Sequence, residues 1–257
     1  MTLRTVGHQA MTGLMGLVFP PTCLTCGRWR GDEESGFCPA CARSLHAVVG
    51  QFYCPRCGMG AGTFSDGNPG PDEKETRCAV CPPRRLPWRR LIRVGKYEGL
   101  MATLVRQFKF HGRSELARLL GDWLWSAVEG AGQGRSGDLI VHIPQPWFRH
   151  VKRGYNPAEL IASRLSRLSK VPLGHVLVRR KSIPRQTTLP RSRRWDNVRG
   201  AFGIRHSRCL DKARVWLVDD VMTTGATAAE AARTLLTAGA GEVRILILAR
   251  AETAHVH

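Results

Sequence analysis

The chain of 257 residues lacks any uninterrupted apolar stretch long enough to span a membrane. It also lacks the signs of a secretory leader, because Thr and Gly interrupt the apolar residues of 1–20 and no small-residue cleavage site follows. These absences predict a cytoplasmic protein in which residues 1–20 form a short amphipathic helix. In a reducing compartment, cysteines are more often metal ligands than disulfide partners.

Acidic residues are scarce. The chain has 20 Asp and Glu against 39 Lys and Arg, for a net charge of +19. Residues 1–83 hold seven of each sign, so the whole surplus lies in residues 84–257. One interpretation is a polyanionic partner such as nucleic acid. The other is compositional, because arginine far outnumbers lysine, as a GC-rich genome would produce.

Cysteine is abundant, and its spacing is informative. Eight of the nine cysteines form four Cys-x-x-Cys pairs: Cys23/Cys26, Cys38/Cys41, Cys54/Cys57 and Cys78/Cys81. Four thiolates complete a closed tetrahedral zinc site, so consecutive pairs predict two structural zinc ions. An interleaved pairing, or a redox role for one pair, stays open. The ninth cysteine, Cys209, is predicted to be a free thiol.

The segment 215–230 predicts a ligand site on an α/β sheet. Val215 to Val218 indicate a buried parallel strand, Asp219 and Asp220 end it, and an Ala-rich helix over 228–238 follows. Open α/β sheets bind ligands at the carboxyl ends of their strands.

The turn of this segment, Thr223-Thr224-Gly225-Ala226-Thr227, places backbone N–H groups and hydroxyls at a helix start, where they bind a phosphate. Two adjacent acids repel each other, so a ribose diol or a hydrated Mg²⁺ is their expected ligand. Together these features resemble the phosphoribosyl-pyrophosphate (PRPP) motif of type I phosphoribosyltransferases.

A second loop is cationic. The predicted strand Leu139–Ile143 is followed by Arg149 and Arg153, and then by Asn156, which is expected to cap a helix that begins at Pro157. A cationic loop at a strand end suits a pyrophosphate group. The alternative is a solvated basic turn.

The other segments predict supporting structure. Arg84–Arg93 is expected to be an edge strand with a solvated face or, alternatively, a nucleic-acid groove in which Trp88 stacks on bases. Two helices are predicted over 97–112 and 114–129, the second capped by Ser114. The basic loop 179–199 is expected to be a lid or a disordered tail. The predicted strand 175–178 precedes it, and residues 201–204 are expected to return the chain to the main sheet.

The order of these motifs resembles the ComF family of phosphoribosyltransferase-like proteins, some of which are associated with natural competence. The motifs are the Cys-x-x-Cys module, Lys109-Phe110-His111-Gly112, Pro144-Gln145-Pro146, Arg153-Gly154-Tyr155-Asn156 and the Asp219-Asp220 segment. Two positions differ from the family pattern: Pro157 stands where Gln is usual, and Ile183 where Thr is frequent. The resemblance implies a zinc-ribbon module over 1–83 and a type I phosphoribosyltransferase fold, an α/β domain, over 84–257.

The resemblance also implies roles for individual residues. Asp219 and Asp220 would hold the ribose hydroxyls with Mg²⁺, and Thr223, Thr224, Gly225, Ala226 and Thr227 the 5-phosphate. Lys109, Arg149 and Arg153 are candidates for the pyrophosphate, with Arg185 closing from the lid. No side chain identifies an acceptor.

Three classes of function follow. The first is a PRPP-binding protein that acts in DNA uptake and holds single-stranded DNA. The second is a transferase that uses PRPP and Mg²⁺ on a nucleobase or an amine. The third is an adaptor whose zinc module docks a helicase-like partner. The complete phosphate motif argues against the third, and the basic surplus outside the zinc module favours the first.

Overall fold

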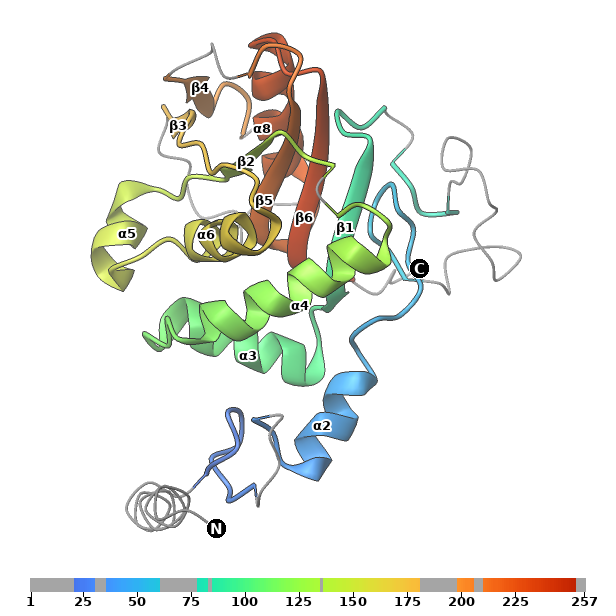
Figure 1. The fold of residues 1–257 in the computed structure, drawn as a ribbon, viewed down its shortest axis with the longest axis vertical. Coiled ribbons are helices and arrows are strands. Elements are labelled where there is room, and N and C mark those ends of the chain that lie inside the picture. The colour runs from blue at the N-terminus through green and yellow to red at the C-terminus, as the bar shows by residue number, and fades with distance from the viewer. Residues whose placement is uncertain are drawn as a thin grey trace, which may run out of the picture.

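The computed structural model describes residues 21–30, 36–60, 78–82, 85–134, 136–180, 198–205 and 210–252 (Figure 1). The predicted helix over 1–20, Cys209, Arg185 and most of the predicted lid lie outside these residues. Among the described helices, none has the length and apolar character that crossing a membrane requires.

The core of the fold is a parallel sheet of four strands in the order β1-β6-β5-β2. The strands are β1 (Arg90–Lys96), β2 (Leu139–His142), β5 (Arg214–Met222) and β6 (Glu242–Arg250). Their continuous runs of Val, Leu and Ile are buried because helices cover both faces of the sheet. The predicted α/β architecture, with β1 at one edge, is therefore confirmed.

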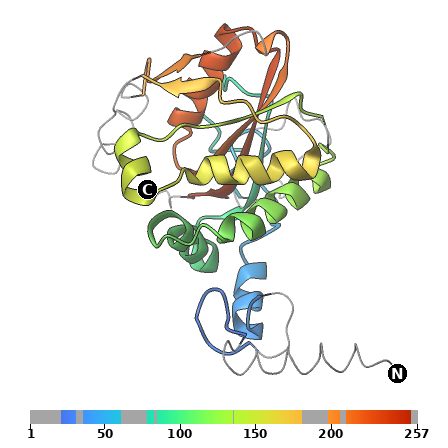
Figure 2. The ribbon, with the colours of Figure 1, turned by 60° about the vertical axis from the view of Figure 1, so that its left-hand side comes forward.

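Three helices cover one face of the sheet and a fourth covers the other (Figures 1 and 2). The first three are α3 (Gly99–Phe110), α4 (Leu116–Gly130) and α6 (Pro157–Ser169), and the fourth is α8 (Ala226–Thr237). Asn156 caps α6 as predicted, since its side chain accepts the Ala158 N–H at 3.2 Å. The prediction of Ser114 as the cap of α4 is wrong, because Glu115 occupies that position.

A second, two-stranded sheet lies beside the main one. Its strands, β3 (Leu177–Arg179) and β4 (Phe202–Ile204), pair antiparallel with each other. The expectation that residues 201–204 return to the main sheet is therefore wrong. A short helix, α5 (Trp147–Arg153), connects β2 to α6.

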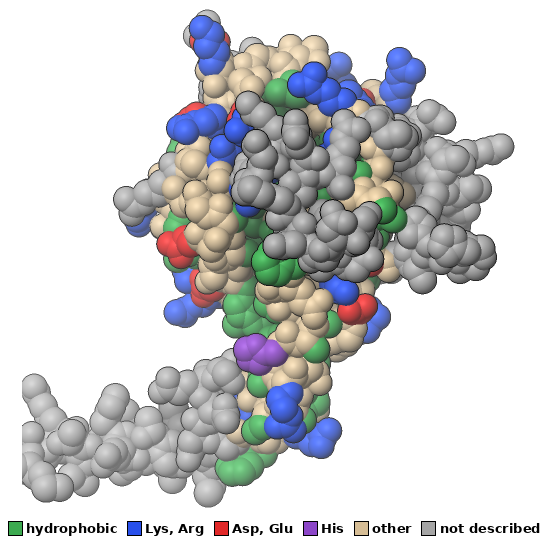
Figure 3. Space-filling model, turned by 90° about the vertical axis from the view of Figure 1, so that its right-hand side faces the viewer, with side chains coloured by type: hydrophobic (Ala, Val, Ile, Leu, Met, Phe, Trp, Pro, Cys, Tyr) green, Lys and Arg blue, Asp and Glu red, His purple; other side chains and the backbone are tan. Residues whose placement is uncertain are grey.

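The cysteine-rich part meets the sheet domain in two places. Helix α2 (Pro39–His46) belongs to the first ribbon, the part that carries Cys23, Cys26, Cys38 and Cys41, and lies against α3. Figure 3 shows the first ribbon projecting from the body of the protein. On the described surface of that face, basic side chains are spread rather than gathered into one patch.

The second ribbon, the part that carries Cys54, Cys57, Cys78 and Cys81, covers the face of β1 that was predicted to be solvated. Arg93 is only 2% exposed, forms an ion pair with Glu252 at 2.6 Å and lies over the ring of Tyr53. Trp88 is also buried, and its Nε1–H donates to the Arg56 carbonyl at 2.8 Å. The alternative in which Trp88 stacks on nucleic-acid bases is therefore wrong, because its ring has no exposed face to offer.

Candidate functional site

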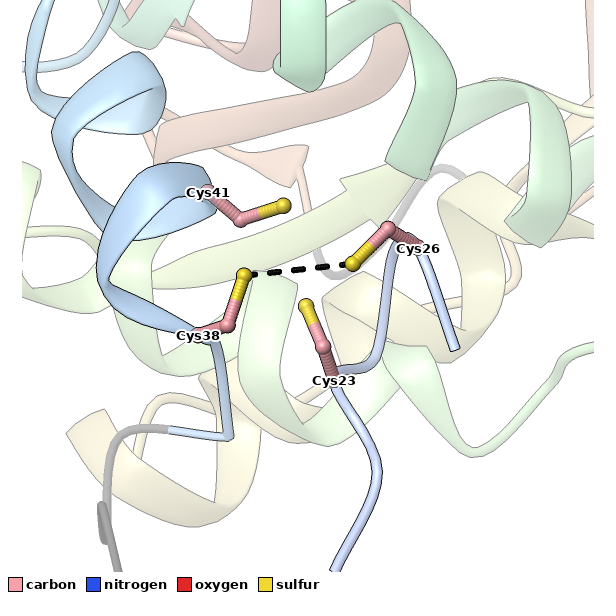
Figure 4. Close-up of side chains that lie close together, drawn as sticks. All are labelled: Cys23, Cys26, Cys38 and Cys41. Carbon is pink, nitrogen blue, oxygen red and sulfur yellow. Dashed lines mark hydrogen bonds between the residues drawn. The ribbon is translucent and has the colours of Figure 1, made fainter. Parts of the chain in front are cut away.

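The first cysteine cluster joins Cys23 and Cys26 of a loop to Cys38 and Cys41 at the start of α2. The four sulfur atoms point toward one another, with 3.8 Å between Cys26 Sγ and Cys38 Sγ (Figure 4). Four sulfurs at 2.3 Å from a central zinc lie about 3.8 Å apart, so the cluster fits the metal. Burial alone would raise the pKa of Cys23, but backbone N–H groups of Cys26, Cys38 and Thr25 lower it to about 6. The thiolate that a metal needs is therefore favoured at Cys23, whereas burial raises the pKa of Cys41 to about 12.

The second cluster joins Cys54, Cys57, Cys78 and Cys81. Its sulfur separations of 3.3 to 3.7 Å also suit one tetrahedral ion. Hydrogen bonds from the other three thiols lower the pKa of Cys54. Pairing of consecutive motifs is thus confirmed over the interleaved alternative, and the two clusters are consistent with two structural zinc ions.

The acid pair lies where the sheet opens. Strand β5 does not end at Asp219, as the sequence suggested, but stays paired with β6 as far as Met222. On its other side, pairing with β2 stops at Val218. Asp219 and Asp220 are therefore the first residues of β5 that β2 no longer pairs with, so this edge of the strand is open. A ligand can approach them there although the strand continues.

The two carboxylates have different surroundings. Asp220 Oδ1 accepts a hydrogen bond from Lys109 Nζ of α3 at 2.8 Å, in an ion pair that is largely buried. Burial, and next the charge of Asp220, raise the pKa of Asp219 to about 7, while Lys109 acts in the opposite direction. Asp219 is therefore the acid that lacks a full counter-charge and is ready for a cationic or hydroxyl ligand.

The predicted phosphate turn joins β5 to α8. Gly225 has φ +79°, a left-handed conformation that a side chain would strain, and it precedes the first residue of α8. The Ala226 N–H lies 3.4 Å from the Thr224 hydroxyl. The first N–H groups of α8 have no acceptors within the helix. They lie at the same end of α8 as Thr223, Thr224 and Thr227. This arrangement fits a phosphate group.

Two arginines from other elements lie within electrostatic reach of the acids. Arg153 of α5 donates to Gln145 Oε1 at 3.2 Å, and burial lowers its pKa against the opposing effect of Asp220. Burial also lowers the pKa of Arg179, the charge of Arg149 adds to this, and Asp219 opposes it. The predicted Arg153 is thus within electrostatic reach of Asp220, and the predicted Arg149 is within reach of Arg153 and Arg179. Arg185 lies outside the described residues.

Arg179 was missed in the sequence because it begins the long basic loop and has no motif around it. The structure places it at the end of β3, where its guanidinium lies 5.5 Å above the Phe202 ring. Gln145 was known only as part of a family motif. Its Nε2–H donates to the Tyr155 carbonyl at 2.7 Å, which braces the turn that follows Arg153 at the end of α5.

Comparison with known families gives two matches along the chain. A double zinc ribbon domain matches residues 14–82, and a phosphoribosyl transferase domain matches residues 151–256. Together with the parallel sheet, these matches confirm the predicted fold class.

Several curated relatives match over almost their whole length. DNA utilization protein YhgH of Salmonella typhi is 33% identical over 238 residues, which cover 91% of this chain and 99% of the relative. Competence protein F of Haemophilus influenzae is 29% identical over 89% of this chain and 96% of its own. Competence protein ComFC of Bacillus subtilis is 27% identical over 91% and 95%.

Among solved structures, a purine phosphoribosyltransferase from Pyrococcus horikoshii is 22% identical over 51% of this chain and 74% of its own, with a TM-score of 0.33.

Proposed function

The chain belongs to the ComF/YhgH family, in which a double zinc ribbon precedes a phosphoribosyltransferase domain, and on that premise we propose that it binds PRPP with Mg²⁺ in DNA uptake or utilization. The observation that carries the proposal is the open edge of β5 at Asp219 and Asp220 beside the N-terminus of α8. Diol-binding acids and a phosphate turn on one strand end are what a ribose 5-phosphate requires.

Each part of PRPP then has a protein partner. The N-terminus of α8 and the threonine hydroxyls of 223–227 hold the 5-phosphate. Asp219 and Asp220 take the ribose hydroxyls, and the Mg²⁺ that accompanies pyrophosphate offsets the negative charge that they add. Arg153 and Arg179, which lie within electrostatic reach of Asp220 and Asp219, would compensate the charge of the pyrophosphate together with Arg149 near them.

Calorimetric titration with PRPP and Mg²⁺ tests this site. We expect the wild-type chain to bind and the double variant Asp219→Ala/Asp220→Ala to lose binding. Asp211→Ala is the matched control, because Asp211 is an exposed acid that precedes β5 at the opposite end of the sheet. Equal affinity in the wild type and the double variant would refute the proposal.

Single-stranded DNA is the proposed polymeric ligand. Helix α5 exposes Trp147 (74%) and Val151 (71%), which share one helix face, with Phe148 beside them. The Arg149 guanidinium lies over the Phe148 ring, and that of Arg153 over the ring of Phe110, which is 66% exposed. Exposed aromatic rings combined with arginines suit unpaired bases joined by phosphates.

The DNA proposal has its own test. Trp147→Ala is expected to weaken binding of a single-stranded oligonucleotide by roughly 1–3 kcal/mol, the contribution of one stacked base. Trp29→Ala is the control, because Trp29 is 69% exposed on the first zinc ribbon. Affinity should also fall steeply as salt increases. Salt-independent binding, or equal losses in the two variants, would contradict the proposal.

Transfer chemistry is the second candidate function. Arg149, Arg153 and Arg179 would stabilise a departing pyrophosphate and so favour cleavage of the bond to ribose. Release of pyrophosphate from PRPP only in the presence of a nucleobase or amine would support transferase activity. If PRPP binds but no acceptor in a broad screen releases pyrophosphate, the transferase proposal fails while the binding proposal stands.

The third candidate function is that of an adaptor, in which the first ribbon docks a partner protein. The ribbon projects from the body of the protein (Figure 3). Trp29 on this ribbon is 69% exposed. A helicase-like protein whose binding is lost on Trp29→Ala, with PRPP affinity unchanged, would support this role.

A further inference from the structure

Three ligand-type side chains that the proposed function does not use meet beside the cavity next to α5. They are His142 at the end of β2, Glu159 in the first turn of α6 and His175 just before β3. His142 and Glu159 line a cavity of about 470 Å³. His142 is buried, while His175 and Glu159 are solvent-accessible, so a small ion can reach all three.

The separations between their ligand atoms suit a single metal ion. His142 Nε2 lies 3.2 Å from His175 Nδ1, and His175 Nδ1 lies 3.7 Å from Glu159 Oε1. Two nitrogens at 2.0–2.1 Å from a tetrahedral zinc are about 3.3 Å apart. The distance between His142 Nε2 and His175 Nδ1 is also that of a hydrogen bond between the two rings.

A neighbouring side chain holds the buried ring of His142 in one orientation. Asn156 Nδ2 lies 3.1 Å from His142 Nδ1 and donates to the Ile143 carbonyl at 3.1 Å, while Asn156 Oδ1 accepts the Ala158 N–H at the start of α6. The Asn156 amide therefore fixes the ring so that Nε2 points toward His175 Nδ1. Groups that orient a metal-binding histidine in this way are typical of metal sites.

We infer that His142, Glu159 and His175 bind one divalent transition-metal ion, with Zn²⁺ the best fit, in a third metal site distinct from both cysteine clusters. Two imidazoles and one carboxylate favour zinc and its neighbours over Mg²⁺, which prefers oxygen ligands. Three protein ligands leave a coordination position for water or an anion. This inference does not rest on PRPP binding.

Metal titration of the full chain tests the inference. After both cysteine clusters are filled with zinc, Co²⁺ is added and followed by absorbance and calorimetry. We expect one further equivalent to bind, with visible d–d bands and no thiolate-to-metal charge-transfer band, because no sulfur takes part. Excess Mg²⁺ should not displace it.

The variants are His175→Ala and Glu159→Gln, both at accessible positions, and the control is His150→Ala, which removes a histidine from the same cavity. His175→Ala should reduce Co²⁺ affinity by more than the roughly 10–100-fold that loss of a second-shell partner causes. His150→Ala should leave it unchanged. The inference is overturned if the wild-type chain takes up no third equivalent, or if His175→Ala binds it equally well. Circular dichroism confirms that each variant is folded.

Discussion

The two zinc ribbons share the same ligand chemistry but differ in how the protein surrounds them. In the first ribbon Cys26 is exposed, while Cys23, Phe37 and Cys38 are buried in the apolar cluster that includes residues of α3 and α4. Arg113 Nη1–H donates to the Leu24 carbonyl at 2.7 Å, and Phe37 stacks on Trp123 of α4 with 5.9 Å between ring centroids. This ribbon therefore packs on the helices that cover one face of the sheet, with part of its cysteine cluster open to solvent.

The second ribbon forms part of a core. Cys54, Cys57 and Cys78 belong to the same apolar cluster as Leu91 of β1 and the inner residues of β5 and β6. Backbone and side-chain hydrogen bonds join it to the sheet: the Leu91 N–H donates to the Pro55 carbonyl at 2.7 Å, and Arg250 Nε–H donates to the Cys57 carbonyl at 2.9 Å. The boundary predicted after residue 83 stays a prediction, but the second ribbon and the sheet share their packing. A zinc site that packs on the strands should therefore affect the stability of the sheet more than one that packs on the outer helices.

The largest expected effect is the loss of the second cluster. Cys57→Ser should unfold the chain or leave it insoluble. A structural zinc contributes on the order of 10 kcal/mol, comparable to the whole stability of a domain, and its loss here also opens the shared core. Thermal unfolding, soluble yield and PRPP titration measure the effect. A variant with native melting temperature and native PRPP affinity would contradict the comparison.

Loss of the first cluster should have a smaller and local effect. Cys26→Ser should remove one zinc per chain and increase hydrogen exchange over residues 21–46. The melting temperature of the sheet domain should fall by about 5 °C or less, since this ribbon packs on the outer helices. PRPP affinity should not change. Equal damage in Cys26→Ser and Cys57→Ser would mean that both ribbons and the sheet fold as one unit.

The third prediction concerns the charge of Asp219 on β5, the strand whose inner residues pack in the same core as the second ribbon. The pKa of Asp219 is raised from 3.8 to about 7, so the stability tied to its protonated form is complete below pH 3.8 and is lost as the pH rises through about 7. Asp219→Asn should therefore stabilise the chain by on the order of 1–3 kcal/mol at pH 8, and hardly at all near pH 4. Denaturant unfolding at both pH values measures this.

Asp138 provides a control of opposite sign for that experiment. Hydrogen bonds from Arg214 lower its pKa to about 2, so it stabilises the fold above pH 3.8 and loses this effect as the pH falls toward 2. Asp138→Asn should therefore destabilise the chain at neutral pH. If both variants shift stability in the same direction, the assignment of charge effects is wrong.

The smallest predicted effect concerns Trp88, which contacts the second ribbon and lies beside the phosphate turn. Trp88 donates to the Arg56 carbonyl, and a Cβ at Gly225 would lie 3.5 Å from its ring. Trp88→Phe should cost about 1 kcal/mol of stability through the lost hydrogen bond, and should weaken PRPP binding a few-fold without zinc loss. Trp125→Phe, in α4 on the opposite face of the sheet, should leave PRPP affinity unchanged. A Trp88→Phe variant with native affinity would show that the ribbon and the turn are independent.

Sequence by itself determined the features that depend on neighbours along the chain. The Cys-x-x-Cys spacing brings two sulfurs to one metal in any fold, so eight ligands were predictable. The β5–turn–α8 segment was predictable because the apolar run, the acids, Gly225 and the helix formers follow one another directly. The Asn156 cap was local as well.

Only the tertiary structure decided which distant segments meet. It determined which Cys-x-x-Cys pairs share a cluster, buried Trp88 and Arg93 under the second ribbon, and paired β4 with β3. It opened the acid pair by ending β2 opposite Val218, and it brought His142, Glu159 and His175 together from three elements. The physical reason is that strand order and core packing depend on contacts between residues far apart in the chain, and periodicity and local propensity carry no information about such contacts.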